Sequence, residues 1–247
     1  EQPLWHKTKI TALYDETMFN FQVLDIIEQT LQLQHPINYQ TETVTEQDWV
    51  SITQRHFQPQ CYNDALWIYP SWHEPPSGDA IVMLDPGLAF GTGTHPTTQL
   101  CLQWLAEHPP VGQTVIDYGC GSGILALAAA ALGADTVWAT DHDPQALEST
   151  TNNAKLNNWL QSQQLHIVTA EALPSKPAPL VLANILANPL IELRPQLEQL
   201  VEPQGTLVLS GILTTEIDKI TQAYQATFDI SDITTQQEWV RITLRKP

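Results

Sequence analysis

The second half of the chain alternates between short apolar runs and longer stretches in which hydrophobic residues recur at helical spacing. Short apolar runs predict buried β-strands, and the longer amphipathic stretches predict helices. The strands are expected at 115–117, 136–140, 166–168, 180–183 and 205–210, with a closing hairpin of 228–233 and 239–244. The helices are expected at 124–132, 144–156, 189–201 and 214–226, where Pro195 can kink the third. Strands that alternate with helices in this way predict an α/β protein with a parallel sheet covered on both faces.

The first sixty residues or so have a different pattern, which predicts a strand, a helix, a second strand and a second helix. These elements are expected at 9–14, 19–31, 37–44 and 45–57. A connecting stretch with several prolines follows and contains two short extended pieces, 66–69 and 81–84. Because a shift in composition and a series of prolines mark a domain boundary, we predict a small domain at 1–57 and a larger one at 58–247. A length of 247 residues fits one α/β domain with a smaller companion.

The chain carries 27 acidic and 10 basic side chains, which give a formal net charge of −17. Proteins that grip a nucleic-acid backbone rely on Lys and Arg, so we expect no direct contact with nucleic acid. The negative charge would suit a basic partner by electrostatic steering, and solubility alone explains it equally well. Three cysteines in no metal-ligand spacing imply neither a disulfide framework nor a metal site. Since no run of 18 apolar residues occurs, we expect no membrane segment and a cytoplasmic protein.

A glycine-rich loop, residues 117–123 (DYGCGSG), follows a predicted strand and opens a predicted helix. Glycines there let the backbone turn sharply and approach a ligand closely. The dinucleotide fingerprint requires its third glycine where this chain has Ile124, and no Lys-Ser/Thr pair follows the loop. A pyrophosphate ligand, and with it a nicotinamide oxidoreductase, is therefore disfavoured, and a ligand with adenosine and an amino acid fits better. Gly119 and Gly121 are candidate cofactor-binding residues, and Asp117 would favour the ammonium group of such a ligand.

Asp141 ends the next predicted strand, 22 residues after Gly119, where a carboxylate can accept both hydroxyls of a ribose. The loop and Asp141 together predict a binding site for S-adenosylmethionine. Asn184 ends the strand at 180–183, and its amide would face the reaction centre and accept a hydrogen bond from an attacking amine. The Ile-Leu-Ala that follows offers no ring to stack on a flipped base, so a nucleobase substrate is disfavoured. The alternative for Asn184 is a simple turn-forming residue before Pro189.

The segment 84–98 contains three glycines and four threonines, and such a loop can lie over a bound ligand. Pro96 predicts the first turn of a helix, with His95 or Thr94 near its N-cap. Thr98 in that first turn would direct its hydroxyl at the ligand. His95 could serve as a catalytic base, but a capping or packing histidine is the favoured interpretation.

These segments resemble the bacterial ribosomal protein L11 methyltransferase (PrmA) family, and the resemblance covers nearly the whole chain. The residues that carry it are 84–98, 117–126, 141–144, 184–187 and 209–213. The resemblance implies a seven-stranded, Rossmann-like class I fold that binds S-adenosylmethionine, preceded by a small ferredoxin-like recognition domain. The region before Phe57 is shorter than that domain in the family, so we expect a truncated α+β N-terminal domain. By position, the family's cofactor contacts fall on Thr98, Gly119, Asp141 and Asn184.

The resemblance also implies a protein N-methyltransferase that trimethylates lysine side chains and the N-terminal amine of a basic ribosomal protein. The expected reaction is a direct displacement in which a neutral amine attacks the sulfonium methyl, so alignment and desolvation matter most. We expect no indispensable acid–base residue, and Asn184 is the candidate for positioning the amine. The alternatives are a methyltransferase for another protein or a small-molecule amine, and a non-catalytic S-adenosylmethionine-binding module. The chain is expected to act as a monomer without a metal ion.

Overall fold

The computed structural model describes residues 22–30, 39–40, 58–75, 78, 80–85, 93–159, 162 and 164–247. The chain divides into two compact units, Glu1–Thr53 and Gln54–Pro247. In the first unit, α1 (Gln22–Thr30) confirms the helix predicted at 19–31. The other elements predicted before residue 58 lie outside the described residues, apart from residues 39 and 40. The predicted boundary after residue 57 and the truncated N-terminal domain stay predictions.

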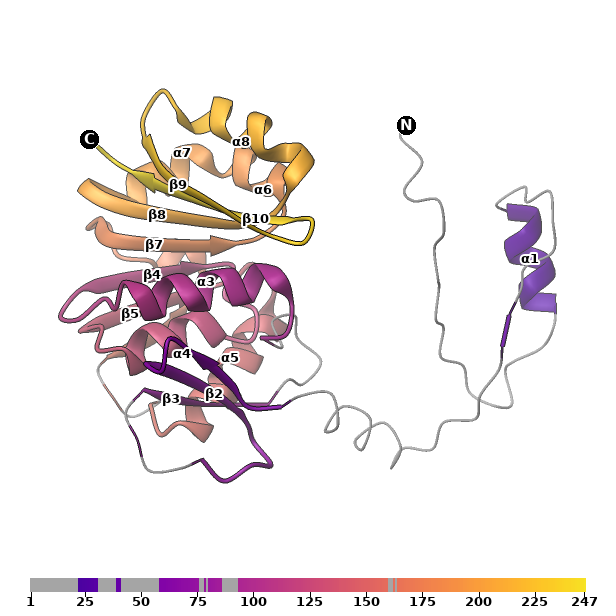
Figure 1. Cartoon of the computed structure of the whole chain (residues 1–247), viewed down its shortest axis with the longest axis horizontal. Helices are drawn as coiled ribbons and strands as arrows, with labels where there is room; N and C mark the ends of the chain where they lie inside the picture. Colours follow the sequence, from indigo (N-terminus) through magenta and orange to yellow (C-terminus); the bar gives the residue numbers. More distant parts are fainter. Residues whose placement is uncertain are drawn as a thin grey trace. The chain divides into compact units, whose positions relative to one another are not determined.

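The second unit is built on a seven-stranded sheet with the order β6-β5-β4-β7-β8-β10-β9 (Figure 1). Its strands are β4 (Thr114–Tyr118), β5 (Thr136–Thr140), β6 (Leu165–Val168), β7 (Ala178–Asn184), β8 (Val201–Leu213), β9 (Asp229–Gln236) and β10 (Trp239–Arg245). The first five strands in this order are parallel, while β10 lies antiparallel to both β8 and β9. This sheet confirms the predicted α/β fold and its closing hairpin. The strand order reverses between β4 and β7, which is where sheets of this kind bind ligands.

Helices cover both faces of the sheet (Figure 1). One face carries α3 (Pro96–Glu107), α4 (Ile124–Ala131) and α5 (Pro144–Leu156). The other face carries α6 (Ala187–Glu192), α7 (Arg194–Leu200) and α8 (Ile217–Tyr224). Successive side chains of a strand point to opposite faces, so Val115 is buried in the first core and Ile116 in the second. The predicted two-sided coverage of the sheet is therefore confirmed.

The helix predicted at 189–201 is wrong in one respect, because the structure divides it into α6 and α7. Pro195 lies in the first turn of α7. A proline has no backbone N–H and its ring clashes with the preceding helical turn, so it fits the start of a helix and not its interior. Val201 already begins β8, which also continues past the predicted end at residue 210.

The stretch predicted to connect the two domains forms a small sheet in the second unit. Its strands are β1 (Gln60–Tyr62), β2 (Leu66–Pro70) and β3 (Ile81–Leu84). β1 pairs antiparallel with β2, and β2 pairs parallel with β3. Four of their side chains are fully buried in the core cluster that contains α4: Leu66, Ile68, Val82 and Leu84. The extended pieces at 66–69 and 81–84 are confirmed, but this sheet contributes to the core instead of serving as a linker.

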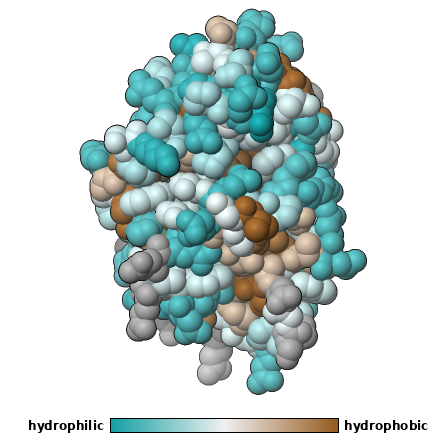
Figure 2. Space-filling model, turned by 90° about the vertical axis from the view of Figure 1, so that its left-hand side faces the viewer, coloured by the Kyte–Doolittle hydropathy of each residue, from teal (hydrophilic) through white to brown (hydrophobic). Residues whose placement is uncertain are grey.

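The surface is mainly hydrophilic, as Figure 2 shows for one face, where hydrophobic side chains form only small groups. Among the described residues of the second unit, the exposed large hydrophobic side chains are Val111, Leu156, Leu186, Ile230 and Ile233. None of the helices in the described part of the chain has the length and hydrophobicity needed to cross a membrane.

Candidate functional site

The glycine-rich loop joins β4 to α4 at the carboxyl end of the sheet. The N–H groups of Gly119 and Cys120 donate to the carbonyl of Thr140 at the end of β5, at 2.8 and 3.0 Å. Gly119 has a φ of +81°, and a Cβ there would lie 2.4 Å from Cγ2 of Ile185, the residue after β7. A larger residue is excluded on conformational and steric grounds. The loop therefore lies between the ends of β5 and β7, where the strand order reverses.

Asp117 is a buried carboxylate in β4, only 1% exposed. Its Oδ2 accepts a hydrogen bond from the N–H of Ala126, in the first turn of α4, at 3.0 Å. Its Oδ1 is buried without a hydrogen-bond partner in the described part of the chain. The pKa of Asp117 is raised to about 7, mainly by burial. The hydrogen bond from Ala126 opposes this shift, and the negative charge of Asp141 adds to it. Such an oxygen is what the ammonium group of a ligand would satisfy, because a buried polar atom normally has a partner.

Asp141 directly follows β5 and contacts the glycine-rich loop. Its Oδ2 accepts a hydrogen bond from the N–H of Gly121, and its Oδ1 accepts one from the N–H of Asp143, both at 3.0 Å. Each carboxylate oxygen has a second lone pair that could accept a ribose hydroxyl, although Oδ1 also lies 3.2 Å from Nδ1 of the exposed His142. The two backbone donors fix the orientation of the carboxylate beside the loop.

Thr98 and Asn184 meet although they are 86 residues apart in the chain. Asn184 is the last residue of β7, and its Nδ2 donates to Oγ1 of Thr98 at 3.3 Å. Thr98 is 3% exposed and lies in the first turn of α3. With Nδ2 used in this bond, Oδ1 of Asn184 is the group that can accept a hydrogen bond from an amine.

His95 is the N-cap of α3, as predicted, and Pro96 follows in the first turn. Its Nδ1 accepts a hydrogen bond from the N–H of Thr97 at 3.4 Å and lies 2.8 Å from Oγ1 of the same residue. Its ring packs edge-on against Trp239, with the ring centroids 4.8 Å apart. The capping interpretation of His95 is confirmed. Residues 86–92 of the segment that precedes it lie outside the described residues.

The first turn of α3 is also tied to the sheet beside it. Ser210 in β8 donates from Oγ to the carbonyl of Thr97 at 3.2 Å. Gln236 at the end of β9 donates from Nε2 to Oε1 of Gln99 at 2.6 Å. These bonds place the helix turn that carries Thr98 against the carboxyl end of the sheet.

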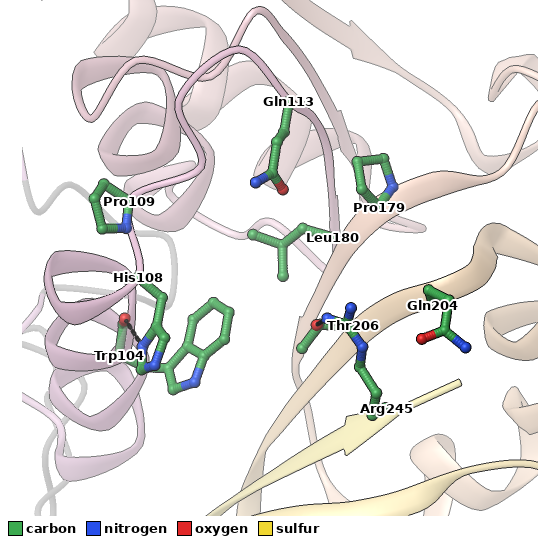
Figure 3. Close-up of a pocket in the computed structure, with 9 residues that line it drawn as sticks. All are labelled: Trp104, His108, Pro109, Gln113, Pro179, Leu180, Gln204, Thr206 and Arg245. Carbon is green, nitrogen blue, oxygen red and sulfur yellow. Dashed lines mark hydrogen bonds between the residues drawn. The ribbon is translucent and has the colours of Figure 1, made fainter. Parts of the chain in front are cut away.

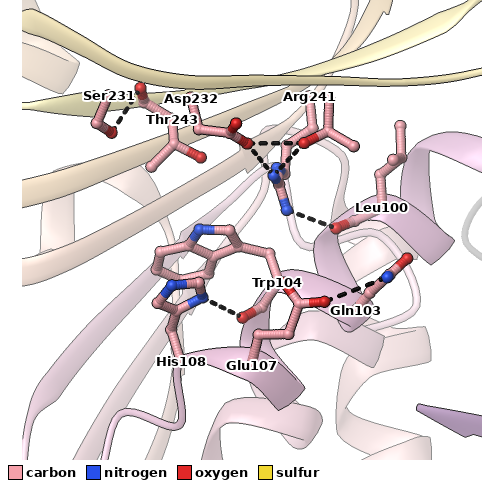
Figure 4. A network of polar contacts seen from close by, with 10 residues as sticks. Leu100, Gln103, Trp104, Glu107, His108, Ser231, Asp232, Arg241 and Thr243 are labelled. Carbon is pink, nitrogen blue, oxygen red and sulfur yellow. Dashed lines mark hydrogen bonds and ion pairs between the residues drawn. The ribbon is translucent and has the colours of Figure 1, made fainter. Parts of the chain in front are cut away.

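Arg241 fastens the next turn of α3 to the closing hairpin (Figure 4). Its side chain donates from Nη2 to Asp232 and Thr234, and from Nη1 to the carbonyl of Leu100 at 3.5 Å. Arg241 is only 5% exposed, whereas the side chain of Asp232 is 51% exposed, so only the cation of this ion pair is buried. An Arg in a strand carries no local signal for such a contact, so the sequence alone does not predict it.

Gly211 in β8 is a second residue whose role the sequence alone does not predict. It has a φ of +84°, and a Cβ there would lie 2.3 Å from the carbonyl oxygen of Ile185. At this point β8 lies so close to the backbone of Ile185, the residue after Asn184, that only a glycine fits. A glycine directly after the strand predicted at 205–210 is the signal that could have indicated this contact. Gly211 therefore helps to fix where β7 ends.

The predicted site residues all lie at one edge of the sheet, at the carboxyl ends of β4, β5 and β7. A cavity of about 310 Å³ lies elsewhere, near the start of β7 and the end of β10 (Figure 3). Its lining includes Trp104, His108, Leu180 and Arg245, and none of the predicted site residues. In the described part of the chain, no three metal-ligating side chains cluster as a metal site requires. The predicted site residues supply a glycine-rich loop, two carboxylates, a hydroxyl and an amide.

A family model described as ribosomal protein L11 methyltransferase (PrmA) matches residues 1–247. The ribosomal protein L11 methyltransferase of Histophilus somni (strain 2336) is 47% identical over 244 residues, which are 98% of this chain and 82% of that protein. That of Teredinibacter turnerae is 45% identical over 244 residues, which are 98% of this chain and 81% of that protein. A crystal structure of a ribosomal protein L11 methylase from Lactobacillus delbrueckii subsp. bulgaricus matches with a TM-score of 0.68 and 34% identity, over 77% of this chain and 100% of that one. By sequence and by fold, this chain belongs to the ribosomal protein L11 methyltransferase (PrmA) family.

Proposed function

We propose that this chain methylates the lysine side chains and the N-terminal amine of ribosomal protein L11. Family membership makes it a methyltransferase that uses S-adenosylmethionine, and the names of its relatives support L11 as the substrate. When bound, S-adenosylmethionine supplies an electrophilic methyl group on a positively charged sulfur. The residues of the chain then have to hold this donor, align a neutral amine with it and exclude water.

The residues at the carboxyl edge of the sheet fit such a donor. Oδ1 of Asp117, for which the described residues supply no hydrogen-bond partner, suits an ammonium group, and the missing Cβ at Gly119 lets the loop lie directly against Ile185 at the end of β7. Asp141, held by the N–H of Gly121, suits a pair of ribose hydroxyls. In this proposal, Gly119, Gly121 and Asp141 bind the donor from the loop side. Thr98 binds it from the α3 side, and Asn184, which donates to Thr98, is placed to position the amine.

The incoming amine must be neutral to attack. A lysine with a pKa of about 10.4 requires about 4.6 kcal/mol to lose its proton at pH 7, whereas an α-amine near 7.8 requires about 1 kcal/mol. Burial and a neighbouring positive charge both lower the pKa of a bound amine. Desolvation can therefore supply much of this free energy, and we propose that no single side chain of the site is an indispensable base.

The observation that carries this proposal is the contact between Asn184 and Thr98. Because Nδ2 of Asn184 donates to Thr98, its Oδ1 is available to accept an N–H of the amine and orient the lone pair. A side chain with this role acts in the chemical step more than in binding the donor. Its loss should lower kcat by about 100-fold, the size expected for a misaligned nucleophile, and leave donor affinity within about twofold.

The test compares Asn184→Ala with Asn188→Ala, a matched change at an exposed residue of α6. The wild type, incubated with recombinant L11 and S-adenosylmethionine, should give mass increases of whole methyl groups that map to lysines and the N-terminus. Asn184→Ala should lose turnover without losing affinity for S-adenosylhomocysteine, and Asn188→Ala should match the wild type. Equal losses in turnover and affinity would contradict the role of Asn184. Methylation of other proteins but not L11 would contradict the substrate.

We further propose that the substrate is a basic protein region, that the chain acts as a monomer in the cytoplasm, and that it contacts no nucleic acid directly. The net charge of −17 supports a basic partner. The substrate class supports the location, since ribosomal proteins are assembled in that compartment. Measuring the mass of the chain in solution would test whether it is a monomer. Measuring its retention on immobilised RNA would test whether it avoids nucleic acid.

A further inference from the structure

The glycine-rich loop is held by two buried polar side chains of α5, the helix that follows α4 and β5 along the chain. Thr150 donates from Oγ1 to the carbonyl of Gly121 at 3.0 Å, and Asn153 donates from Nδ2 to the carbonyl of Ser122 at 2.9 Å. Both side chains are almost fully buried, Asn153 to within 1%. α5 thus contributes hydrogen bonds to the loop, although none of its residues belongs to the predicted site.

Asn153 makes a second contact that Thr150 does not make. Its Oδ1 accepts a hydrogen bond from the N–H of Asp85 at 2.9 Å, and Asp85 is the residue directly after β3. One buried amide therefore bridges the glycine-rich loop and the end of the small sheet. Only an amide side chain offers a donor and an acceptor in this arrangement. A residue of another type could keep the bond to Ser122 or the bond to Asp85, but not both.

The bond to Ser122 fixes more than one carbonyl. The carbonyl of Ser122 and the N–H of Gly123 belong to the same rigid peptide plane, and that N–H donates to the carbonyl of Cys120 at 2.7 Å to close the turn of the loop. Holding the Ser122 carbonyl therefore orients the turn from which α4 begins. The start of a helix after such a turn is where backbone N–H groups face a ligand.

We propose that Asn153 is a positioning residue for the methyl donor, which acts by setting the shape of the glycine-rich loop relative to β3. The inference rests on the proposed role of this loop in binding S-adenosylmethionine. It predicts that Asn153 affects donor affinity through the loop, without itself contacting the donor. A residue with a merely structural role would change stability and leave affinity unchanged.

The chain offers a matched control one helical turn further along α5. Asn157 makes the same pair of amide contacts, accepting from the N–H of Met83 at 2.8 Å and donating to the carbonyl of Met83 at 2.7 Å. These bonds fasten α5 to β3 but do not reach the glycine-rich loop. Asn157→Asp and Asn153→Asp are compared at pH 8.5, so that the new carboxyl is ionised. Each then keeps the acceptor oxygen and replaces the N–H donor with a negative charge, and the two variants differ in whether the loop loses its bond.

The experiment measures the Kd for S-adenosylhomocysteine by calorimetry, the melting temperature, and kcat at saturating donor for both variants and the wild type. We expect Asn153→Asp to raise the Kd about tenfold, the effect of losing one buried hydrogen bond, with kcat within about threefold of the wild type. Both variants should lower the melting temperature to a similar extent. Asn157→Asp should leave the Kd within about twofold of the wild type. Asn153→Gln keeps a donor and an acceptor, so its affinity for S-adenosylhomocysteine should exceed that of Asn153→Asp. This variant also tests the positioning role of Asn153 if Asn153→Asp does not fold.

An unchanged Kd in Asn153→Asp, or an equal rise in Asn157→Asp, would overturn the positioning role while leaving the proposed function intact. A Kd for Asn153→Gln no better than that for a folded Asn153→Asp would also overturn it. If the wild type itself does not bind S-adenosylhomocysteine, the proposed function fails together with this inference.

Discussion

Asp117 is the residue at which binding and stability oppose each other most clearly. Its pKa is raised from 3.8 to about 7 in the folded chain, mainly by burial. One pKa unit corresponds to about 1.4 kcal/mol, so keeping this carboxylate ionised in the folded chain lowers the free energy of unfolding by about 4 kcal/mol above pH 7. Because the folded pKa lies above the unfolded one, stability is highest below about pH 4 and is lost as the pH rises to about 7.

Asp117→Asn removes the charge and keeps an oxygen for the N–H of Ala126. The new NH₂ group takes the position of the unpartnered Oδ1, and an unsatisfied buried donor costs about 1–3 kcal/mol at every pH. The variant should therefore be about 2 kcal/mol more stable than the wild type at pH 8.5, with most of this advantage lost at pH 5.5. The same change should weaken binding of S-adenosylhomocysteine by about 10- to 100-fold, since it removes a charged hydrogen bond to the ammonium group.

Urea unfolding at pH 5.5 and pH 8.5 measures the difference in stability, and calorimetry measures the affinity for S-adenosylhomocysteine. Asp135→Asn, at an exposed aspartate before β5, is the control and should change stability by less than about 0.5 kcal/mol. A difference between Asp117→Asn and the wild type that does not grow with pH would refute the burial argument. Unchanged affinity would refute the assignment of Asp117 to the ammonium group.

Two further predictions concern the packing around the site. Gly211→Ala should unfold more easily than Gly112→Ala by about 1–3 kcal/mol, because both glycines have positive φ but only the Cβ at Gly211 meets backbone, that of Ile185. Denaturant unfolding checks this prediction, and equal losses would contradict it. Arg241→Ala should lower stability by about 1–3 kcal/mol, since it removes a buried side chain that packs on α3 and donates to Thr234 and the carbonyl of Leu100. A change in melting temperature no larger than that of an exposed Arg→Ala variant would contradict that role.

The parts of the fold and site that the sequence predicts are those encoded by short patterns. The helix at 144–156 has the predicted bounds because Asp143 caps it and Pro144 starts it. The glycine-rich loop and Asp141 follow from their spacing along one β-α-β unit, and the structure brings them into contact at 3.0 Å. Asn184 could be placed at the same edge because it ends a strand parallel to the others.

The parts that the sequence does not predict depend on contacts between distant residues. Asn153 bonds to a residue 68 positions away and Arg241 to one 141 positions away. In a helix or strand pattern, each is only a polar residue. The small sheet of residues 60–84 has the same origin, because proline-rich extended pieces predict a linker until their burial against α4 is known. Pro195 predicts a kink, but whether it bends or ends a helix depends on the packing of α6 and α7.

The central claim is that the carboxyl ends of β4, β5 and β7 hold the methyl donor. A crystal structure of the chain with S-adenosylhomocysteine tests it most directly. The account predicts that the ribose hydroxyls lie within hydrogen-bond distance of Asp141 and that the ammonium group lies against Oδ1 of Asp117. A nucleoside bound elsewhere, such as in the cavity beside Trp104 and Arg245, or an ammonium group away from Asp117, would contradict it.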